Sequence, residues 1–356
     1  MKFAQIARPY FFEIFTVVNF IILFVAYPAV ARPMVNTFAP VFGSFAVFFL
    51  VPLLIAIFVR LALAYRRGTS RELLAIYRSG GWISDSVRMT IFTGLFVHAY
   101  TWIKLTTPVL HPRLFDQQLW NVDRSIAFGY SPTVFLATLF SAPAMMRFLD
   151  ATYATVLFPA LSIVPSFIIS MPEHRVRIAF VNSNTLLWLV GAWLYVAIPS
   201  LGPAYSFPAV WLPLAPMLTH SQYVQRLLIE NYGAVQSSLT ANTKPINVFF
   251  GVAAFPSLHV GFQVLSFFWM RRLTRWGATV FGILAFLALI GSIVTGWHYL
   301  VDGIAGGLLA WACYAAAQRI PQYALDSRRF PHHARSNPET NCARRDPGRE
   351  NGRGRA

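Results

Sequence analysis

Long apolar runs dominate the sequence, and they constrain the fold more than any other feature. A helix needs about 20 mainly apolar residues to cross a bilayer. The candidate runs are 11–31, 42–64, 89–107, 148–170, 180–200, 257–270, 277–296 and 300–317. Hydrophobic residues make up 56% of the 356 residues, charged residues only 12%, and the mean hydropathy is +0.53. The sequence therefore predicts an all-α fold, a polytopic membrane helical bundle with about six to eight transmembrane helices.

Three segments between these runs are predicted to lie outside the spans. Residues 112–132 form an amphipathic helix in the outer interface, with apolar side chains on one side at Leu114, Phe115, Leu119, Val122 and Ile126. Residues 131–143 begin with Ser131 as an N-cap and Pro132 at the first helical position, and they predict a short re-entrant helix. The proline-rich segment 201–256 is predicted to be a long loop that covers a site or is disordered.

The formal net charge is +16, and the placement of the basic residues predicts an orientation. If the runs alternate from a cytoplasmic N-terminus, most lysines and arginines fall in cytoplasmic segments, as the positive-inside rule requires. Both termini are then cytoplasmic, and the helix starts near 257 and 300 face the periplasmic, extracellular or luminal side. No basic and aromatic patch indicates a nucleic acid partner.

The chain divides into two regions by composition. Residues 1–320 are predicted to form an integral membrane catalytic domain, whose core motifs lie at 254–307. Residues 321–356 are polar, arginine-rich and without apolar periodicity, so they predict a disordered cytoplasmic tail that contacts anionic lipid head groups. The two cysteines indicate neither a disulfide framework nor a metal site.

Two histidines and an aspartate are the candidate catalytic residues. His259 follows Pro256 in the first turn of one predicted span, and His298 and Asp302 stand at the start of another. Residues four apart share a helix face, so Asp302 can bind one imidazole nitrogen and leave the other free to attack. Two converging helix N-termini would also attract an anion such as a phosphoryl group. Gly303 and Gly307 predict close helix packing behind these residues.

Other interpretations of this cluster stay open from the residues alone. His298 and Asp302 could form a buried polar pair that only orients helices, or a proton relay in a transporter. His259, His298 and Asp302 could bind zinc, but no fourth ligand has a suitable spacing, so we predict no metal and no cofactor. Ionisable groups inside a membrane cost roughly 2.5–3.5 kcal/mol each, which favours a function over a structural role.

Two motifs resemble those of a known family. PSLH at 256–259 and HYLVDGIAGG at 298–307 are similar to the second and third signature motifs of the type 2 phosphatidic acid phosphatase superfamily. The leucine at 258, where the phosphatases have glycine, resembles the inositol phosphorylceramide synthase branch. The resemblance implies that His298 attacks phosphorus and forms a phosphohistidine, and that Asp302 orients it. It also implies that His259 protonates the leaving oxygen and then activates the acceptor.

The chain departs from the phosphatase pattern at positions that bind phosphate. Gly291 and Ser292 stand where the phosphatases carry Ser-Arg, and the first motif, a lysine followed after six residues by Arg-Pro, is missing, because Lys244 is followed directly by Pro245. A phosphodiester carries one negative charge and a phosphomonoester about −1.5 to −2, so fewer cations favour the diester.

The sequence therefore predicts a phosphotransferase that moves a lipid head-group phosphate to a second lipid or alcohol, with membrane lipids as donor and acceptor. The alternative is a lipid phosphate phosphatase, and a proton-coupled transporter is a third interpretation. The candidate substrate-binding residues are Lys244, Arg226, Arg147 and Ser257. The oligomeric state does not follow from the sequence.

Overall fold

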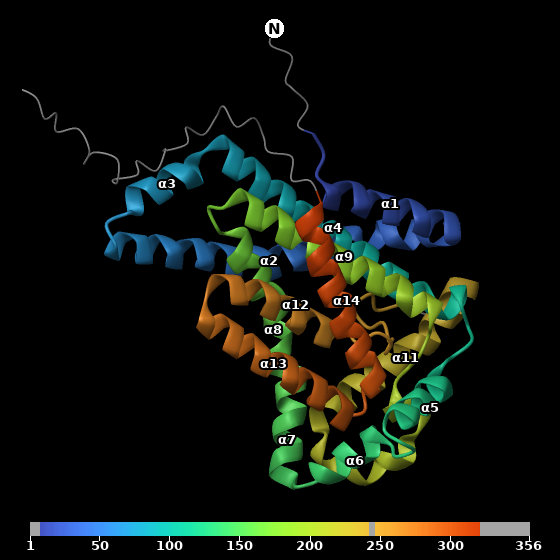
Figure 1. Cartoon of the computed structure of the whole chain (residues 1–356). Helices are drawn as coiled ribbons and strands as arrows, with labels where there is room; N and C mark the ends of the chain where they lie inside the picture. The colour runs from blue at the N-terminus through green and yellow to red at the C-terminus, as the bar shows by residue number, and fades with distance from the viewer. Residues whose placement is uncertain (1–7, 242–245, 321–356) are drawn as a thin grey trace, which may run out of the picture. The chain divides into compact units, whose positions relative to one another are not determined.

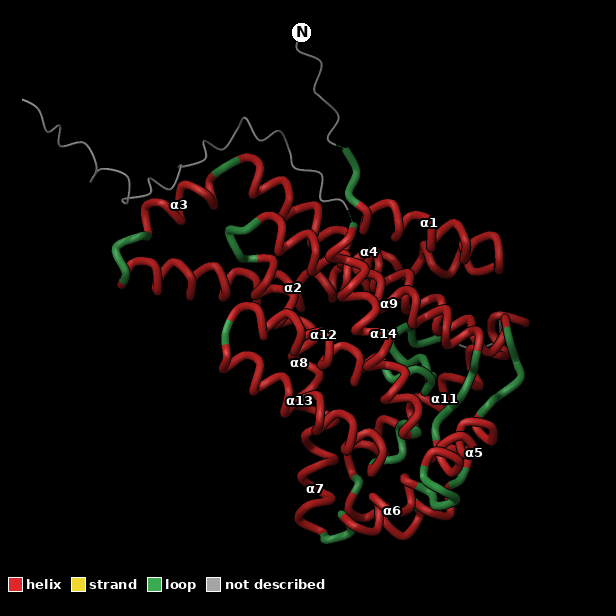
Figure 2. Tube along the Cα trace, viewed as in Figure 1, coloured by secondary structure: helices red, strands yellow, loops and turns green. Residues whose placement is uncertain are grey.

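The structure, a computed structural model, describes residues 8–241 and 246–320, which fold into helices joined by short turns (Figure 1). Figure 2 shows no strand in these residues, so the predicted all-α fold is confirmed. The first half of the chain holds α1 (Phe11–Ala26), α2 (Ala31–Arg66), α3 (Ser70–Arg78), α4 (Gly80–Leu110), α5 (Asp116–Ile126), α6 (Pro132–Leu139), α7 (Pro143–Ala151) and α8 (Leu157–Ile169). The second half holds α9 (His174–Ala197), α10 (Pro203–Ser206), α11 (Thr219–Ala241), α12 (Leu258–Leu273), α13 (Arg275–Val294) and α14 (Leu300–Arg319).

Several helices are long and apolar enough to cross a membrane. In the described residues these are Pro28–Arg66, which contains α2, together with α9, α13 and α14, and a fifth if the bent pair α6–α7 counts as one span. Of the other predicted spans, α1 and α12 have 16 residues each, and α4 carries Asp85, Arg88 and Lys104. Large apolar side chains such as Phe58 and Trp276 are exposed, at 72% and 82%. Such a surface is stable in lipid and not in water, so this is a polytopic membrane protein.

Helix α9 is the centre of the bundle. It packs against α4, α14, α12 and α1, and its buried residues point in all directions around the helix. Helices α12 and α13 form a hairpin, and α14 then runs parallel to α12, since Ser257 and Gly306 meet at one end of the pair and Arg272 donates to Gln318 at the other. The N-terminal ends of α12 and α14 therefore lie side by side.

The two predicted non-spanning helices are present, and the predicted long loop is largely helical. Ser131 caps α6 by accepting a hydrogen bond from the backbone N–H of Val134. The pair Pro132–Leu139 and Pro143–Thr155 is bent by 116°, the geometry of a broken span or a re-entrant loop. A π-helix at Thr152–Val156 continues α7 into α8. The expectation of a long loop at 201–256 was wrong for its middle part, because Thr219–Ala241 forms the 23-residue α11.

Close packing of α12 on α14 depends on Gly306 rather than on Gly307. A Cβ added to Gly306 would lie 2.2 Å from the carbonyl oxygen of Ser257, and one added to Gly261 would lie 2.9 Å from the carbonyl oxygen of Gly306. At Gly307 the nearest atom would be 4.0 Å away, and Gly303 instead faces Leu289 of α13. The predicted small-residue contact is therefore real but lies one position away, because Gly306 is on the side of α14 that meets α12.

These two neighbouring glycines provide a matched test of the packing. We expect Gly306→Ala to destabilise the protein by about 1–3 kcal/mol or more, because backbone atoms rather than a flexible side chain occupy the space. Gly307→Ala should be neutral or stabilising by up to about 1 kcal/mol through helix propensity. Thermal unfolding of the two variants in detergent measures the difference, and equal midpoints would contradict the assigned contact.

Candidate active site

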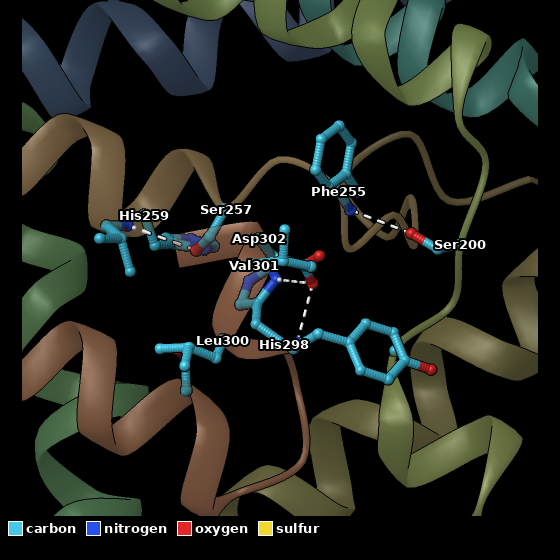
Figure 3. A network of polar contacts seen from close by, with 12 residues as sticks. Ser200, Phe255, Ser257, His259, His298, Leu300, Val301 and Asp302 are labelled. Atoms are coloured by element: carbon cyan, nitrogen blue, oxygen red, sulfur yellow. Dashed lines mark hydrogen bonds and ion pairs between the residues drawn. The ribbon is translucent and has the colours of Figure 1, made fainter. Parts of the chain in front are cut away.

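The first half of the site is the start of α12. Ser257 is the N-cap residue, fully buried, and its Oγ accepts a hydrogen bond from the backbone N–H of Val260 at 3.5 Å. His259 is in the first helical turn and is half-buried. The preceding segment is held by Ser200, whose Oγ accepts from the N–H of Phe255 at 3.0 Å (Figure 3). Ser257 thus caps α12, and its predicted substrate-binding role stays a prediction.

The second half of the site is the turn into α14. His298 Nδ1 lies 3.4 Å from Asp302 Oδ2, and both side chains are buried. His298 precedes the helix, so the pair meets through a cap and not through one helix face as the spacing suggested. Asp302 Oδ2 also accepts from the backbone N–H of Tyr299 at 2.9 Å, which closes the capping turn. The turn thereby places Nδ1 of His298 beside the carboxylate of Asp302 (Figure 3).

The two halves are joined directly. The backbone N–H of Ser257 donates to the backbone oxygen of Asp302 at 2.9 Å, so the start of α12 is hydrogen-bonded to the first turn of α14. His298 lies close enough to His259 for their charges to interact. The Tyr153 hydroxyl is 3.4 Å from Nδ1 of His259. His259, His298 and Asp302 are therefore brought together, as the sequence predicted, on the end of the bundle opposite Arg272.

Burial controls the charge of the candidate nucleophile. Desolvation lowers the pKa of His298 to about 3, the positive charge of Lys104 lowers it further, and a hydrogen bond to the backbone of Ala254 opposes the shift. The imidazole is therefore neutral near pH 7. A neutral imidazole retains the lone pair that a nucleophile needs.

Lys104 of α4 is a cation at the site that the sequence analysis did not select. Its charge acts on both His259 and His298. Its side chain passes Gly251, where an added Cβ would lie 3.2 Å from Lys104 Cγ. The ammonium group lies 5.5 Å from the centre of the Tyr195 ring and 5.9 Å from that of Tyr100. The aromatic rings position the ammonium group in the part of the bundle that contains the two imidazoles.

Helix α5 holds the second half of the site in place through two buried aspartates. Asp123 accepts from the backbone N–H groups of Leu300 and Val301, both at 2.8 Å. Asp116 accepts from the hydroxyl of Tyr299 and from the N–H of Gly202, both at 2.9 Å. The amphipathic helix thus turns its carboxylates inward onto the start of α14.

This clamp corrects one expectation about anion binding. The first N–H groups of α14 are already bound by the carboxylates of Asp123 and Asp302, so this helix start is not open to a phosphate. At the start of α12, no acceptor is found in the described residues for the backbone N–H groups of Leu258 and His259. Only one of the two helix N-termini therefore has donors to offer an anion.

The buried position of Asp123 predicts a pH dependence of stability. Desolvation raises the pKa of Asp123 to about 6 from its ordinary value of 3.8, and the charge of Asp302 adds to the shift, while the two backbone hydrogen bonds oppose it. A carboxyl group with a raised pKa in the folded state stabilises that state fully below pH 3.8, and this contribution is lost as the pH rises through 6. We expect the unfolding midpoint in detergent to fall over this window, and to fall less steeply in Asp123→Asn. Parallel curves for the two proteins would contradict the assignment.

The chain was compared with known families, curated proteins and solved structures. A family model described as the PAP2 superfamily matches residues 117–316, more than half of the chain, and the matched range includes His259, His298 and Asp302. The chain belongs to the PAP2 superfamily. No curated protein and no solved structure matches it. The match confirms the superfamily that the PSLH and HYLVDGIAGG motifs indicated, and it supports a phosphatase-type phosphoesterase family.

Within the PAP2 superfamily pattern, Lys104 now accounts for the first motif. It is followed after six residues by His111 and Pro112, so the chain carries the lysine and the proline of this motif with a histidine in place of the arginine. The substitution hid the motif from a search for Arg-Pro. His111 makes a 2.8 Å contact through Nδ1 with the backbone oxygen of Val196. The signal that could have identified Lys104 was a lysine followed after six residues by a His-Pro pair.

In place of the arginine of the third PAP2 motif, this chain carries a serine, Ser292. Ser292 is fully buried, its hydroxyl donates to the backbone oxygen of Leu289 at 2.9 Å, and its own carbonyl oxygen accepts from the N–H groups of Trp297 and His298. Ser292 supplies no positive charge to the site, and its backbone oxygen holds the turn that carries His298.

The other predicted phosphate cations are placed less favourably. Arg147 on α7 and Arg226 on α11 are exposed, and neither has a polar contact with His259, His298 or Asp302 in the part of the chain that the structure describes. Lys244 lies outside the described residues, as does the predicted basic tail at 321–356. The roles of Arg147, Arg226 and Lys244 stay predictions.

Proposed function

We propose that the protein is a membrane phosphotransferase that acts on a lipid phosphodiester through a phosphohistidine on His298. The observation that carries this proposal is the charge balance of the site. Lys104 acts on both imidazoles, whereas Ser292 and His111 stand where the superfamily has arginines, and the carboxylates of Asp123 and Asp302 bind the start of α14. Among the described residues, Lys104 is the one cation that acts on both imidazoles, and a cation beside buried carboxylates suits a phosphodiester with one charge better than a phosphomonoester with about −1.5 to −2.

The proposed first half-reaction forms a covalent intermediate. Nε2 of neutral His298 attacks phosphorus, and the bond between phosphorus and the oxygen of the donor lipid breaks. The negative charge of the bound diester favours the protonated form of His259, which gives its proton to that leaving oxygen, so the donor lipid departs as an alcohol. Asp302 holds the proton on Nδ1 of His298 and stabilises the positive charge that the ring acquires.

The second half-reaction runs the same steps toward the acceptor. Neutral His259 removes the proton from a hydroxyl group of the second lipid or alcohol, whose oxygen attacks phosphorus while the bond to His298 Nε2 breaks. The head-group phosphate, for example phosphoinositol, is thereby moved without hydrolysis. The leucine at 258, which resembles the inositol phosphorylceramide synthase branch, supports this choice of reaction. A sphingolipid such as ceramide is the corresponding acceptor.

The alternative function is hydrolysis of a lipid phosphate of the phosphatidate or polyprenyl phosphate type. Membership of the PAP2 superfamily supports it, because the same three residues serve water as acceptor. A proton-coupled transporter is a weaker candidate, since the family match favours phosphoester chemistry. The mechanism uses a histidine nucleophile, and we expect activity to survive a metal chelator.

We also propose the orientation in the membrane. His259 and His298 stand at the N-terminal ends of two parallel helices, and Arg271, Arg272 and Arg319 at their other ends. Because basic residues concentrate on the cytoplasmic side, the site faces the periplasm, the cell exterior or a lumen, and both termini are cytoplasmic.

One experiment distinguishes the two reactions. Purified protein is incubated with phosphatidylinositol carrying labelled phosphate, with and without ceramide or diacylglycerol. We expect the label to appear in a second lipid when ceramide is present. Label released only as water-soluble phosphate, with none in a second lipid, would contradict transfer and favour the phosphatase.

A further inference from the structure

We propose that Tyr153 is a further catalytic residue, which accepts a hydrogen bond from Nδ1–H of His259 and donates its own proton to a phosphate oxygen of the bound diester. This proposal rests on the proposed function. Its first support is the 3.4 Å contact between the Tyr153 hydroxyl and His259 Nδ1. The two rings also meet edge to face, with centroids 5.8 Å apart at 68°.

The backbone around Tyr153 is built to place this side chain. Tyr153 lies in the π-helix Thr152–Val156, inside the broken helix that runs from α7 into α8. A π-helical turn inserts an extra residue and re-aims the side chains that follow, and such turns are frequent at functional sites. The ring stacks on Trp297, the neighbour of His298, at a centroid distance of 6.4 Å and 28°. Tyr153 therefore lies between the turns that carry the two histidines.

Gly291 packs against Tyr153. A Cβ added to Gly291 would lie 3.4 Å from Cβ and 3.6 Å from Cδ2 of Tyr153, with the backbone oxygen of Leu149 at 3.7 Å. The residue at 291 is the one where the phosphatases carry serine, directly before their arginine. In this chain a glycine and a buried Ser292 stand there, and a tyrosine from another helix approaches the same place.

The chemistry of the reaction explains why a neutral partner suits His259. His259 alternates between imidazolium, which protonates the leaving oxygen, and neutral imidazole, which deprotonates the acceptor. If Tyr153 oxygen accepts Nδ1–H in both states, every proton transfer passes through Nε2. A carboxylate partner would stabilise the imidazolium and weaken it as an acid, and a phenol does this far less. The 3.4 Å separation is long for a hydrogen bond, as catalytic contacts often are before substrate binds.

The phenolic proton then remains for the substrate. No acceptor for it other than His259 is found among the described residues. A tyrosine O–H gives a phosphate oxygen a hydrogen bond without adding positive charge. With Lys104 as the cation and Tyr153 as a neutral donor, the site has a set of ligands matched to a phosphate with one negative charge.

The test compares Tyr153→Phe with the wild type and with Tyr314→Phe as a matched control. The phenylalanine side chain keeps the ring contacts with Trp297 and Gly291, so we expect an unchanged unfolding midpoint in detergent. Tyr314 stacks on Phe268 in the far half of α14, and its hydroxyl is remote from the site. Transfer of labelled phosphoinositol from phosphatidylinositol to ceramide gives kcat and KM, and quenched-flow labelling gives the rate of phosphoenzyme formation.

We expect Tyr153→Phe to lower kcat and the rate of phosphoenzyme formation about 10²-fold, with KM changed far less, as for loss of one hydrogen-bond donor in a transition state. Tyr314→Phe should stay within about two-fold of the wild type. A folded Tyr153→Phe protein with wild-type kcat and labelling rate would overturn the proposal for Tyr153. Failure of the proposed function appears differently, as a wild-type protein that forms no phosphoenzyme or releases only phosphate. If the wild-type protein releases only phosphate, the rates of hydrolysis of the wild type, Tyr153→Phe and Tyr314→Phe are compared in the same way.

Discussion

His298→Gln is expected to abolish phosphoryl transfer and the covalent intermediate together. Glutamine is close to histidine in size and polarity but has no nucleophilic nitrogen, so phosphorus cannot be captured. Loss of a covalent nucleophile typically costs at least about 10³–10⁴-fold in kcat. The measurement is incorporation of label from phosphatidylinositol into the protein, as a linkage that is labile in acid and stable in alkali.

The control for this experiment is another histidine on the same side of the bundle. His220 of α11 contacts Asp150 at 3.2 Å through Nδ1 and is about half exposed. His220→Gln should label as the wild type does. If His298→Gln still incorporates acid-labile label, His298 is not the nucleophile, and His259 becomes the candidate to test next.

Lys104→Met should lower kcat/KM by about 10²–10³-fold, equivalent to roughly 2.7–4 kcal/mol of transition-state stabilisation. The reason is that Lys104 is the cation whose charge reaches both imidazoles. Methionine preserves the apolar stem that passes Gly251 and removes the ammonium group that lies 5.5 Å from the centre of the Tyr195 ring, so the change removes the charge and little of the packing. Lys104→Arg should recover part of the activity, because the charge is restored at a different length.

Arg226→Gln and Arg147→Gln complete this comparison. Both arginines are exposed on α11 and α7, so we expect smaller losses than for Lys104→Met. Assays with a phosphodiester and with a phosphomonoester, each at matched ionic strength, show whether the order of the three variants holds. A Lys104→Met protein whose kcat/KM stays within about three-fold of the wild type would contradict the proposal that Lys104 supplies the positive charge of the site.

The local signals in the sequence were sufficient to find the superfamily motifs. A cap residue acts within one helical turn, so Ser131 before Pro132 and Ser257 before α12 could be recognised from their neighbours alone. His298 and Asp302 are also near in sequence, and a capping turn brings them to 3.4 Å. The superfamily was recognisable for the same reason, since its motifs are short and contiguous.

The supporting residues could not be recognised in that way. Asp123 caps α14 although 177 positions separate it from Leu300, and no feature of the α5 sequence indicates that Asp123 binds the start of α14. Tyr153 reaches His259 across 106 positions through a π-helix that has no sequence signature. Lys104 was within reach of a motif search, but the histidine at 111 replaced the arginine that defines the motif.

The sequence by itself determined that this protein is an all-α membrane protein of a phosphoesterase superfamily, with His259, His298 and Asp302 at helix starts. Apolar run length, helix caps and short motifs act over a few residues, so they can be read without a fold. Only the tertiary structure decided that Lys104, the capping residue Asp123 and Gly306 lie around those residues. These partners are set by the packing of α4 on α9 and of α5 and α12 on α14, and contacts between distant segments produce no periodic pattern in the sequence.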